Sequence, residues 1–351
     1  MPNVSPMTDP HRLLPDIPLV ESPLFDDVLR VCNFDSETAR VAIDLNQSGY
    51  AVVRFDDLAI EERAERIKSE HKQYFDFADW CRKDWPQGIG MRTTDTWKTS
   101  ADVRAIAANE YMQRLLSAVF GRRAWPFQTL IFPVGSQQHY HSDSVHFSSI
   151  PERFMCGVWL ALEDVHEDAG PLVYYPGSHK WPILYNDLLG VRITGNEGRR
   201  TQSVYEPVWE ALVAKHGLKP MRFLPKKGEA LIWLANLLHG GARQRDPGRT
   251  RWSQVTHYFF DNCCYITPML SDVLIGRLFL RDIVDISSGE PVPNIYVDVP
   301  LSKLEQPAQI VLPADFDRTR YLQLNLDVAN AGADPAEHYL TFGAREGRRY
   351  R

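Results

Sequence analysis

The chain has 351 residues, of which 44% are hydrophobic and 24% are charged, a composition typical of a soluble globular protein. Its formal net charge of −6 gives no reason to expect nucleic acid or an anionic membrane surface as a partner. No apolar run approaches the roughly 20 residues that span a bilayer. The first sixteen residues also lack the basic and apolar regions of a signal peptide.

The cysteines indicate a reducing compartment. They are scattered, odd in number and without CxxC spacing, so neither a disulfide framework nor a zinc knuckle is implied. The adjacent Cys263 and Cys264 could in principle bind a metal, but we expect them to be buried as small hydrophobic side chains. A reducing cytoplasm is the expected location. The five are Cys32, Cys81, Cys156, Cys263 and Cys264.

The N-terminal part of the chain is predicted to be largely helical. Residues 1–35 are interpreted as an N-terminal arm. A helix is expected from Ser36 to Asn46, and Gly49 ends it before a first strand that reaches Phe55. Apolar residues at helical spacing then predict mostly helix over 58–85 and one further helix over 102–120.

The pattern changes to short strands after residue 127. Apolar and β-branched runs are separated by Gly and Pro turns, a pattern typical of a β-sandwich or jelly roll. Residues 180–223 interrupt it with a polar loop and a helix at about 207–216, and such insertions often cover a site. The predicted strands are 128–132, 154–162, 172–175, 229–234 and 252–260.

The C-terminal part is predicted to be separate from this domain. Residues 300–314 hold three prolines and are interpreted as a linker after an oxygenase-sized domain over 36–299. The remaining residues, 315–351, are expected to form a small helical module with two short helices, over 321–329 and 338–343.

Four residues carry the chemistry of the chain. His141 and Asp143 are two positions apart, and on a strand they would point to the same face. His239 lies far downstream before two glycines, and Arg251 follows twelve residues later. Two His, one carboxylate and open positions make the facial triad of non-haem Fe(II) oxygenases. The Arg is the bidentate partner that a 2-oxoacid carboxylate needs.

Each of these assignments has a simpler alternative. Arg251 could be a surface residue like its neighbours Arg243, Arg245 and Arg249, but strand alternation groups it with Ser253 and Val255. Other histidines could line the pocket or serve the structure. His139 shares the strand phase of His141, His146 is out of phase, and His257 shares the phase of Arg251; His179 is the fourth.

Several weaker signals are interpreted structurally. His71 is expected to be a packing or surface residue, and the Gly88–Gly90 pair is too short for a nucleotide-binding motif. Some aromatic residues could line a site, although aromatics more often form core. The candidates are Trp97, Phe147, Tyr174, Trp181, Tyr185 and Trp233.

The chain resembles the phytanoyl-CoA dioxygenase family of Fe(II)/2-oxoglutarate oxygenases, which includes ectoine hydroxylases. The matching residues follow the order of the family over about 130 residues. They are His141-Ser142-Asp143, Val158 through Asp164, Gly170-Pro171-Leu172, Pro176 through His179, His239-Gly240 and Arg251 through Tyr258.

The resemblance implies a double-stranded β-helix, cupin-like core with flanking helices. It implies iron ligands at His141, Asp143 and His239, and a 2-oxoglutarate carboxylate at Arg251. It also implies a co-substrate pocket lined by Gln128, Gln138, Trp159 and Ser253. Gly241 departs from the family, because some members carry a Ser there that contacts 2-oxoglutarate. Related halogenases have a small residue at the position of Asp143, so its presence argues for an oxygenase outcome.

The resemblance therefore predicts an Fe(II)- and 2-oxoglutarate-dependent dioxygenase. We expect it to use O2 and to hydroxylate a small-molecule or carrier-bound metabolite, with release of succinate and CO2. The same chemistry could instead end in desaturation, epimerisation or cyclisation. A non-catalytic saccharide-binding β-barrel is the alternative outside enzymes, because residues 315–351 resemble short modules appended to bacterial polysaccharide-modifying proteins. The sequence leaves the oligomeric state open.

Overall fold

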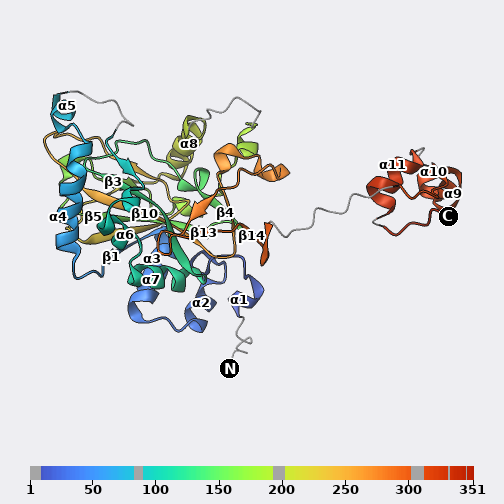
Figure 1. Ribbon diagram of the computed structural model, residues 1–351, viewed down its shortest axis with the longest axis horizontal. Helices are drawn as coiled ribbons and strands as arrows, with labels where there is room; N and C mark the ends of the chain where they lie inside the picture. Colours follow the sequence, from blue (N-terminus) through green and yellow to red (C-terminus); the bar gives the residue numbers. More distant parts are fainter. Residues whose placement is uncertain (1–8, 83–89, 193–201, 302–311, 331–332, 345) are drawn as a thin grey trace. The chain divides into compact units, whose positions relative to one another are not determined.

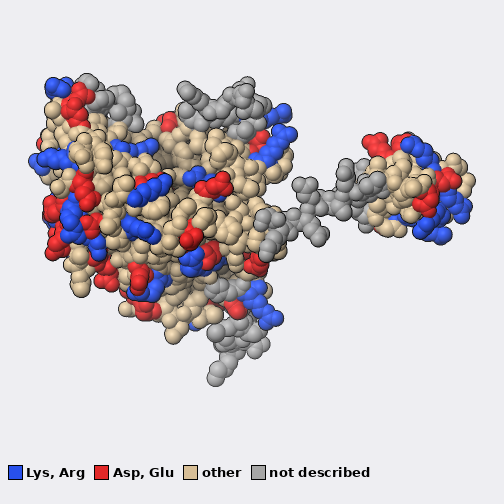
Figure 2. Space-filling model, in the orientation of Figure 1, with Lys and Arg blue, Asp and Glu red and all other residues tan. Residues whose placement is uncertain are grey.

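The computed structural model describes all residues except 1–8, 83–89, 193–201, 302–311, 331–332 and 345 (Figure 1). The chain divides into two compact units, Met1–Pro300 and Leu301–Arg351, and each is described by itself. Within the described residues no helix combines the length and the apolar character needed to cross a membrane. Figure 2 shows acidic and basic side chains interspersed over the visible face of the first unit.

A six-stranded antiparallel sheet forms the centre of the first unit, in the order β1-β8-β5-β10-β3-β2. The predicted strands at 128–132, 154–162, 229–234 and 252–260 are confirmed as its members. The bounds are Tyr50–Arg54 (β1), Thr93–Thr94 (β2), Ala124–Phe132 (β3), Met155–Ala161 (β5), Glu229–Leu234 (β8) and Ser253–Phe260 (β10).

A three-stranded sheet, in the order β7-β6-β9, packs against one face of this sheet. Its strands are β6 (Leu172–Tyr174), β7 (Met221–Phe223) and β9 (His239–Gly241). Trp159 and Val255 of the large sheet share a buried apolar cluster with Leu172 and Phe223 of the small one. Because alternate side chains point to opposite faces, the space between the two sheets is lined by every second residue of β5 and β10.

Helices cover the other face of the large sheet (Figure 1). The side chains of Val158 and Tyr258 pack there, in one apolar cluster with residues of the helices. The bounds of these helices are α3 (Ser36–Ser48), α4 (Ile60–His71), α5 (Phe77–Arg82), α6 (Ala101–Ala107) and α7 (Glu110–Phe120).

The ends of these helices follow from local chemistry. The Asp35 carboxylate accepts from the Thr38 N–H at the start of α3, and Gly49 ends the helix with a left-handed φ of 83°. The single helix predicted over 102–120 is wrong. It is two helices, because the Asn109 side chain accepts from the Met112 N–H and caps a new start. The mostly helical stretch predicted over 58–85 is formed by α4, a 3-10 turn over Lys72–Tyr74 and α5, and residues 83–85 lie outside the described residues.

The N-terminal segment packs onto the same core. Its elements are α1 (Pro10–Leu13), a 3-10 helix (Leu19–Glu21) and α2 (Phe25–Val31). Val20 is fully buried in the main apolar cluster, and the buried carboxylate of Glu21 forms an ion pair with Arg153.

Shorter elements complete the first unit. The helix predicted at about 207–216 is confirmed as α8 (Glu206–His216), while most of the polar loop before it lies outside the described residues. Small two-stranded sheets pair β4 (Ser148–Ile150) with β11 (Cys264–Ile266), β12 (Ile283–Val284) with β13 (Pro291–Val292), and β14 (Ile295–Tyr296) with β15 (Val299–Pro300).

Single 3-10 turns connect many of these pieces. They are η2 (Lys72–Tyr74), η3 (Thr96–Lys98), η4 (Asp143–Val145), η5 (Glu167–Ala169), η6 (Ser178–Lys180), η7 (Asn186–Leu189), η8 (Gln202–Val204), η9 (Pro268–Leu270) and η10 (Val273–Ile275).

The second unit is helical but more finely divided than predicted. Its helices are α9 (Arg318–Leu324), α10 (Leu326–Asn330) and α11 (Pro335–His338), followed by a π-helical turn, η12 (Tyr339–Gly343). Asn325 leaves the helical conformation, with φ −129° and ψ 73°, so the helix predicted over 321–329 breaks in two. Tyr321, Val328 and Tyr339 form its small buried core. Most of the linker predicted over 300–314 lies outside the described residues.

Candidate metal centre

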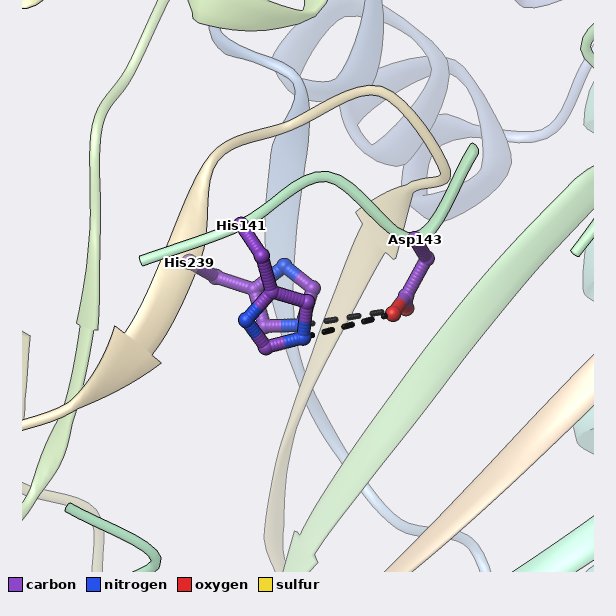
Figure 3. A group of neighbouring side chains, drawn as sticks. All are labelled: His141, Asp143 and His239. Carbon is purple, nitrogen blue, oxygen red and sulfur yellow. Dashed lines mark ion pairs between the residues drawn. The ribbon is translucent and has the colours of Figure 1, made fainter. Parts of the chain in front are cut away.

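His141, Asp143 and His239 meet in the space between the two sheets (Figure 3). The side chains of all three are buried. The His141 Nε2 lies 3.6 Å from one oxygen of Asp143, and the His239 Nε2 lies 3.7 Å from the other. One ligand atom from each residue falls within 4.8 Å of the others. The three side chains predicted as a triad are therefore brought together.

The backbone that brings them together is not the predicted strand. Gln137 has a left-handed φ of 51°, which an extended strand does not allow. His141 forms one isolated antiparallel bridge with His239, through backbone hydrogen bonds of 2.8 and 3.0 Å. Asp143 then begins η4, with Ser142 as its N-cap. The bridge places the two imidazoles side by side, and the 3-10 turn brings Asp143 back towards them.

The two imidazoles are held in the tautomer that a metal needs. The His141 Nδ1 lies 3.0 Å from the carbonyl oxygen of His139, and the His239 Nδ1 lies 3.0 Å from that of Leu237. A carbonyl only accepts, so each Nδ1 carries the proton and donates it. The lone pair of each ring is therefore on Nε2, the atom that faces Asp143. Metal-binding histidines are oriented in this way by a second hydrogen bond.

Asp143 is oriented by Trp233, a contact that the sequence did not indicate. The indole Nε1–H donates to one oxygen of Asp143 at 2.9 Å, which leaves the other oxygen for a metal. The indole lies across β5 at Gly157, where an added Cβ would come within 2.1 Å of the Trp233 ring. Gly157 is thus required by this indole. Sequence reasoning had Trp233 only as a candidate pocket aromatic.

The protonation states suit a divalent cation. Burial lowers the pKa of His141 to about 4, with a further contribution from His239, so the ring is neutral near pH 7. Burial alone would raise the pKa of Asp143, but the neighbouring imidazoles, His239 first and then His257 and His141, hold it below the ordinary range. A neutral His141 and an ionised Asp143 are the forms that bind a metal, so protons compete little at these two ligands.

The other candidate histidines take different positions. His139, a candidate either for the pocket or for a structural role, is absent from the lining, and its Nε2 pairs with Glu210. His179 is buried elsewhere and contacts the carbonyl oxygen of Asn46. His257 lines the cavity, with its Nε2 3.6 Å from Asp143. His146 also lines it, although the strand phase predicted otherwise.

A cavity of about 310 Å³ opens beside the triad. The predicted residues Gln128, Gln138, Trp159 and Arg251 all line it, together with His141, Asp143 and His239. Ser253 is absent from the lining but is fully buried next to it on β10. Of the candidate aromatics, Phe147 and Trp233 line the cavity, and Trp97, Tyr174, Trp181 and Tyr185 do not.

Arg251 is a buried cation without a carboxylate partner among the described residues. Only 2% of it is exposed. Its Nη2 makes one long bond of 3.5 Å to the carbonyl oxygen of Val134, and its Nε has no partner. The guanidinium lies 5.2 Å from the ring of Trp159, and burial lowers its pKa to about 10. A buried charge of this kind is costly unless a ligand pairs with it.

A second polar group beside Arg251 is also unpaired. The hydroxyl of Ser253 is fully buried and has no hydrogen-bond partner among the described residues. Strand alternation places Ser253 on the same face of β10 as Val255 and His257, which both line the cavity. An unpaired guanidinium and an unpaired hydroxyl next to one cavity fit the carboxylate of a bound acid.

The position of Gly241 has no room for the serine that some family members carry there. A Cβ there would lie 2.6 Å from the backbone nitrogen of Gln137, closer than atoms approach without a backbone shift. At the neighbouring Gly240 a Cβ would lie 2.7 Å from the carbonyl oxygen of Gln138. The close approach of β9 to residues 137–140 therefore requires both glycines, and the hydroxyl of Ser136, which lines the cavity, lies 2.6 Å from the Cβ position at Gly241.

Comparison with known proteins identifies a family. A sequence model described as phytanoyl-CoA dioxygenase (PhyH) matches residues 45–251. Peroxisomal phytanoyl-CoA dioxygenase of Rattus norvegicus is 27% identical over 141 residues, which cover 38% of this chain and 36% of that protein. The Bos taurus protein is 26% identical over 140 residues, 37% of this chain and 36% of that protein. The chain thus matches about a third of the length of these curated relatives.

Solved structures show the same fold. A structure described as the non-haem α-ketoglutarate-dependent carbocyclase SnoK from nogalamycin biosynthesis aligns with a TM-score of 0.50 and 14% identity. The alignment covers 74% of this chain and 94% of that one.

Proposed function

Because this chain belongs to the phytanoyl-CoA dioxygenase family, we propose that it is an Fe(II)- and 2-oxoglutarate-dependent dioxygenase that hydroxylates a small-molecule or carrier-bound metabolite. Iron and 2-oxoglutarate are its cofactor and co-substrate. One observation carries the proposal. A single cavity holds both a His-Asp-His group that suits iron and a buried arginine that needs an anion.

The triad would hold the iron. His141 and His239 would bind through Nε2, and Asp143 through the oxygen that Trp233 leaves free. Two imidazoles and one carboxylate leave positions open for a co-substrate and O2. Asp143 itself fills the position that a halide needs in related halogenases, which supports oxygenation as the outcome.

Arg251 would bind the far carboxylate of 2-oxoglutarate, with the Ser253 hydroxyl beside it. The charge-assisted pair would neutralise a guanidinium that has no carboxylate partner among the described residues and whose Nε has no hydrogen bond. Gln128, Gln138 and Trp159 line the same cavity and would fix the orientation of the co-substrate. We also infer that the two facing sheets form a double-stranded β-helix, since this arrangement opens a cavity between them.

When bound, iron and 2-oxoglutarate would supply the oxidising chemistry, in which O2 is consumed, 2-oxoglutarate becomes succinate and CO2, and a C–H bond of the substrate becomes C–OH. The contribution of the chain is to place the parts and to keep water out. The apolar cluster that contains Trp159, Leu172 and Val255 borders the cavity, and it would shield the charged carboxylates from solvent. All five cysteines are free, which suits a reducing compartment such as the cytoplasm.

A co-substrate assay tests the proposal. Purified protein is supplied with Fe(II), ascorbate, O2 and 2-oxoglutarate, and succinate is measured with and without candidate metabolites. Succinate formation that depends on Fe(II) and is absent in Asp143→Ala supports the proposal. A product heavier by one oxygen identifies hydroxylation, whereas loss of two hydrogens or an isomer identifies desaturation, cyclisation or epimerisation. Full activity of Asp143→Ala without an added anion rules out the assigned triad.

A further inference from the structure

The cavity has two ends, and strand β10 runs from one to the other. Ser253 lies beside Arg251, whereas His257 lies 3.6 Å from Asp143 at the other end. Four residues of extended strand separate them, or roughly 13 Å. His146 and Phe147 belong to the His257 end, since the Phe147 and His257 rings are 5.1 Å apart. If 2-oxoglutarate occupies the Arg251 end, as the proposed function requires, this other end is left for the primary substrate.

A hydrogen-bond relay fixes the tautomer of His146. The Gln202 Nε2 donates to a carboxylate oxygen of Glu206 at 3.0 Å. A carboxylate only accepts, so the amide nitrogen of Gln202 must face Glu206 and its oxygen must face the other way. That oxygen lies 3.2 Å from the Nε2 of His146, which must therefore carry the proton. The lone pair of His146 is left on Nδ1.

The Nδ1 of His146 has no hydrogen-bond partner among the described residues, and the ring lines the cavity. The lone pair on Nδ1 is therefore available as a hydrogen-bond acceptor. We propose that His146 Nδ1 accepts a hydrogen bond from a substrate hydroxyl and selects an alcohol or polyol as the primary substrate. This inference rests on the proposed function, since it assigns the second end of the same cavity.

The cavity favours a hydroxyl over an ammonium group as the donor. Asp143 is the only carboxylate among the described residues that line it. Its two oxygens already serve the Trp233 indole and the proposed metal. An ammonium would therefore be buried without a counter-ion, which is costly. Neutral polar groups such as Gln128 and Thr94 line the same cavity. About 310 Å³ in total, shared with 2-oxoglutarate, leaves room for a ring-sized group next to His146.

The test alters the hydrogen-bond relay by a substitution at Glu206, which does not line the cavity. Cyclohexanol and cyclohexanone serve as probes, because they share a ring and only the alcohol can donate. Their dissociation constants are measured by NMR on protein loaded with Zn(II) and 2-oxoglutarate. Wild type is expected to bind cyclohexanol about tenfold more tightly, the size of one lost hydrogen bond. In Glu206→Lys the ammonium should turn the Gln202 amide around and move the His146 proton to Nδ1, so the preference should reverse towards cyclohexanone.

Glu210→Lys is the matched control on the same helix. Glu210 pairs with His139 outside the cavity, so this variant should keep the preference for cyclohexanol. The ¹⁵N shifts of His146 provide a second readout, with Nε2 protonated in wild type and Nδ1 protonated in Glu206→Lys. If Glu206→Lys fails to fold, Gln202→Leu replaces it and should abolish the preference.

Two results would overturn the inference: a protonated Nδ1 in wild type, or equal binding of the two probes. The binding of 2-oxoglutarate is measured first on the same sample. Its absence counts against the proposed function, whereas bound 2-oxoglutarate with no preference for the alcohol counts against the His146 assignment alone.

Discussion

Replacing Arg251 by Met should weaken 2-oxoglutarate binding strongly without destabilising the free protein. Loss of a buried charge-assisted partner costs about 2–5 kcal/mol, or about 30-fold to 4000-fold in the dissociation constant of 2-oxoglutarate. The free protein behaves differently because, among the residues that the structure describes, the guanidinium donates only to the carbonyl oxygen of Val134 and has no ion pair with a carboxylate. Burial lowers its pKa from 12.5 to about 10, which corresponds to about 3 kcal/mol of folding free energy.

The sign of this contribution is unfavourable at neutral pH. A base whose pKa is lower in the folded state has its charged form penalised there, and the penalty is relieved only as the pH rises above about 10. Arg251→Met should therefore unfold at the same urea concentration as wild type or higher.

Urea unfolding gives the stability of the free protein, and calorimetry with Fe(II) gives the affinity for 2-oxoglutarate. The control is Arg249→Met, since Arg249 is half-exposed and pairs with Asp246. If Arg251→Met keeps its affinity for 2-oxoglutarate and loses several kcal/mol of unfolding free energy, Arg251 is a structural cation. If Arg249→Met loses affinity for 2-oxoglutarate, the carboxylate site is at Arg249.

Three further predictions follow from the same contacts. Trp233→Phe removes the N–H that holds Asp143 and should lower metal affinity 10- to 100-fold by metal titration, whereas Trp125→Phe, in the cluster on the helix side, should not. Burial lowers the pKa of His179 from 6.5 to about 4. Its contribution to stability, up to about 3 kcal/mol, is therefore present above pH 6.5 and is lost as the pH falls towards 4. Between pH 7 and 5 His179→Gln should lose less stability than wild type in urea unfolding, and an equal loss would contradict the shift. A chain that ends at Ala314 should keep Fe(II)-dependent succinate formation, because all proposed site residues precede it; a folded but inactive truncation would place the C-terminal module in the site.

Strand alternation predicted one wall of the site from the sequence. Val255 and His257 on β10 share the alternation phase of Arg251, which precedes the strand by two residues, and all three line the cavity. The strand over 229–234 is matched residue for residue, because a continuous apolar run follows the Lys227-Gly228 turn. A regular element carries its side-chain directions with it, so the pattern of a long strand is sufficient to place them.

The positions of His139 and His146 could not be predicted because the phase argument assumed a strand through residues 137–146. The backbone is not a continuous strand there, because Gln137 has a left-handed φ and a 3-10 turn begins at Asp143. In a 3-10 helix residues three apart lie on the same side. His146 therefore turns towards the cavity with Asp143, while His139 points to Glu210.

The contact between Trp233 and Asp143 had no local signal. The two residues are 90 positions apart, and the indole reaches the carboxylate only because Gly157, on the paired strand β5, leaves space for it. Such a contact depends on the register of two strands and on the packing of one sheet on the other. The sequence supplies each residue but not the register that joins them.

An anaerobic titration tests the central claim most directly. Metal-free protein is titrated with Fe(II), in the presence and absence of 2-oxoglutarate. Binding is followed by calorimetry for wild type, His239→Ala and the control His139→Ala, since His139 does not line the cavity. Wild type is expected to bind one Fe(II) per chain and to bind 2-oxoglutarate only with the metal. Both should be lost in His239→Ala and retained in His139→Ala. Equal Fe(II) affinity in wild type and His239→Ala would contradict it.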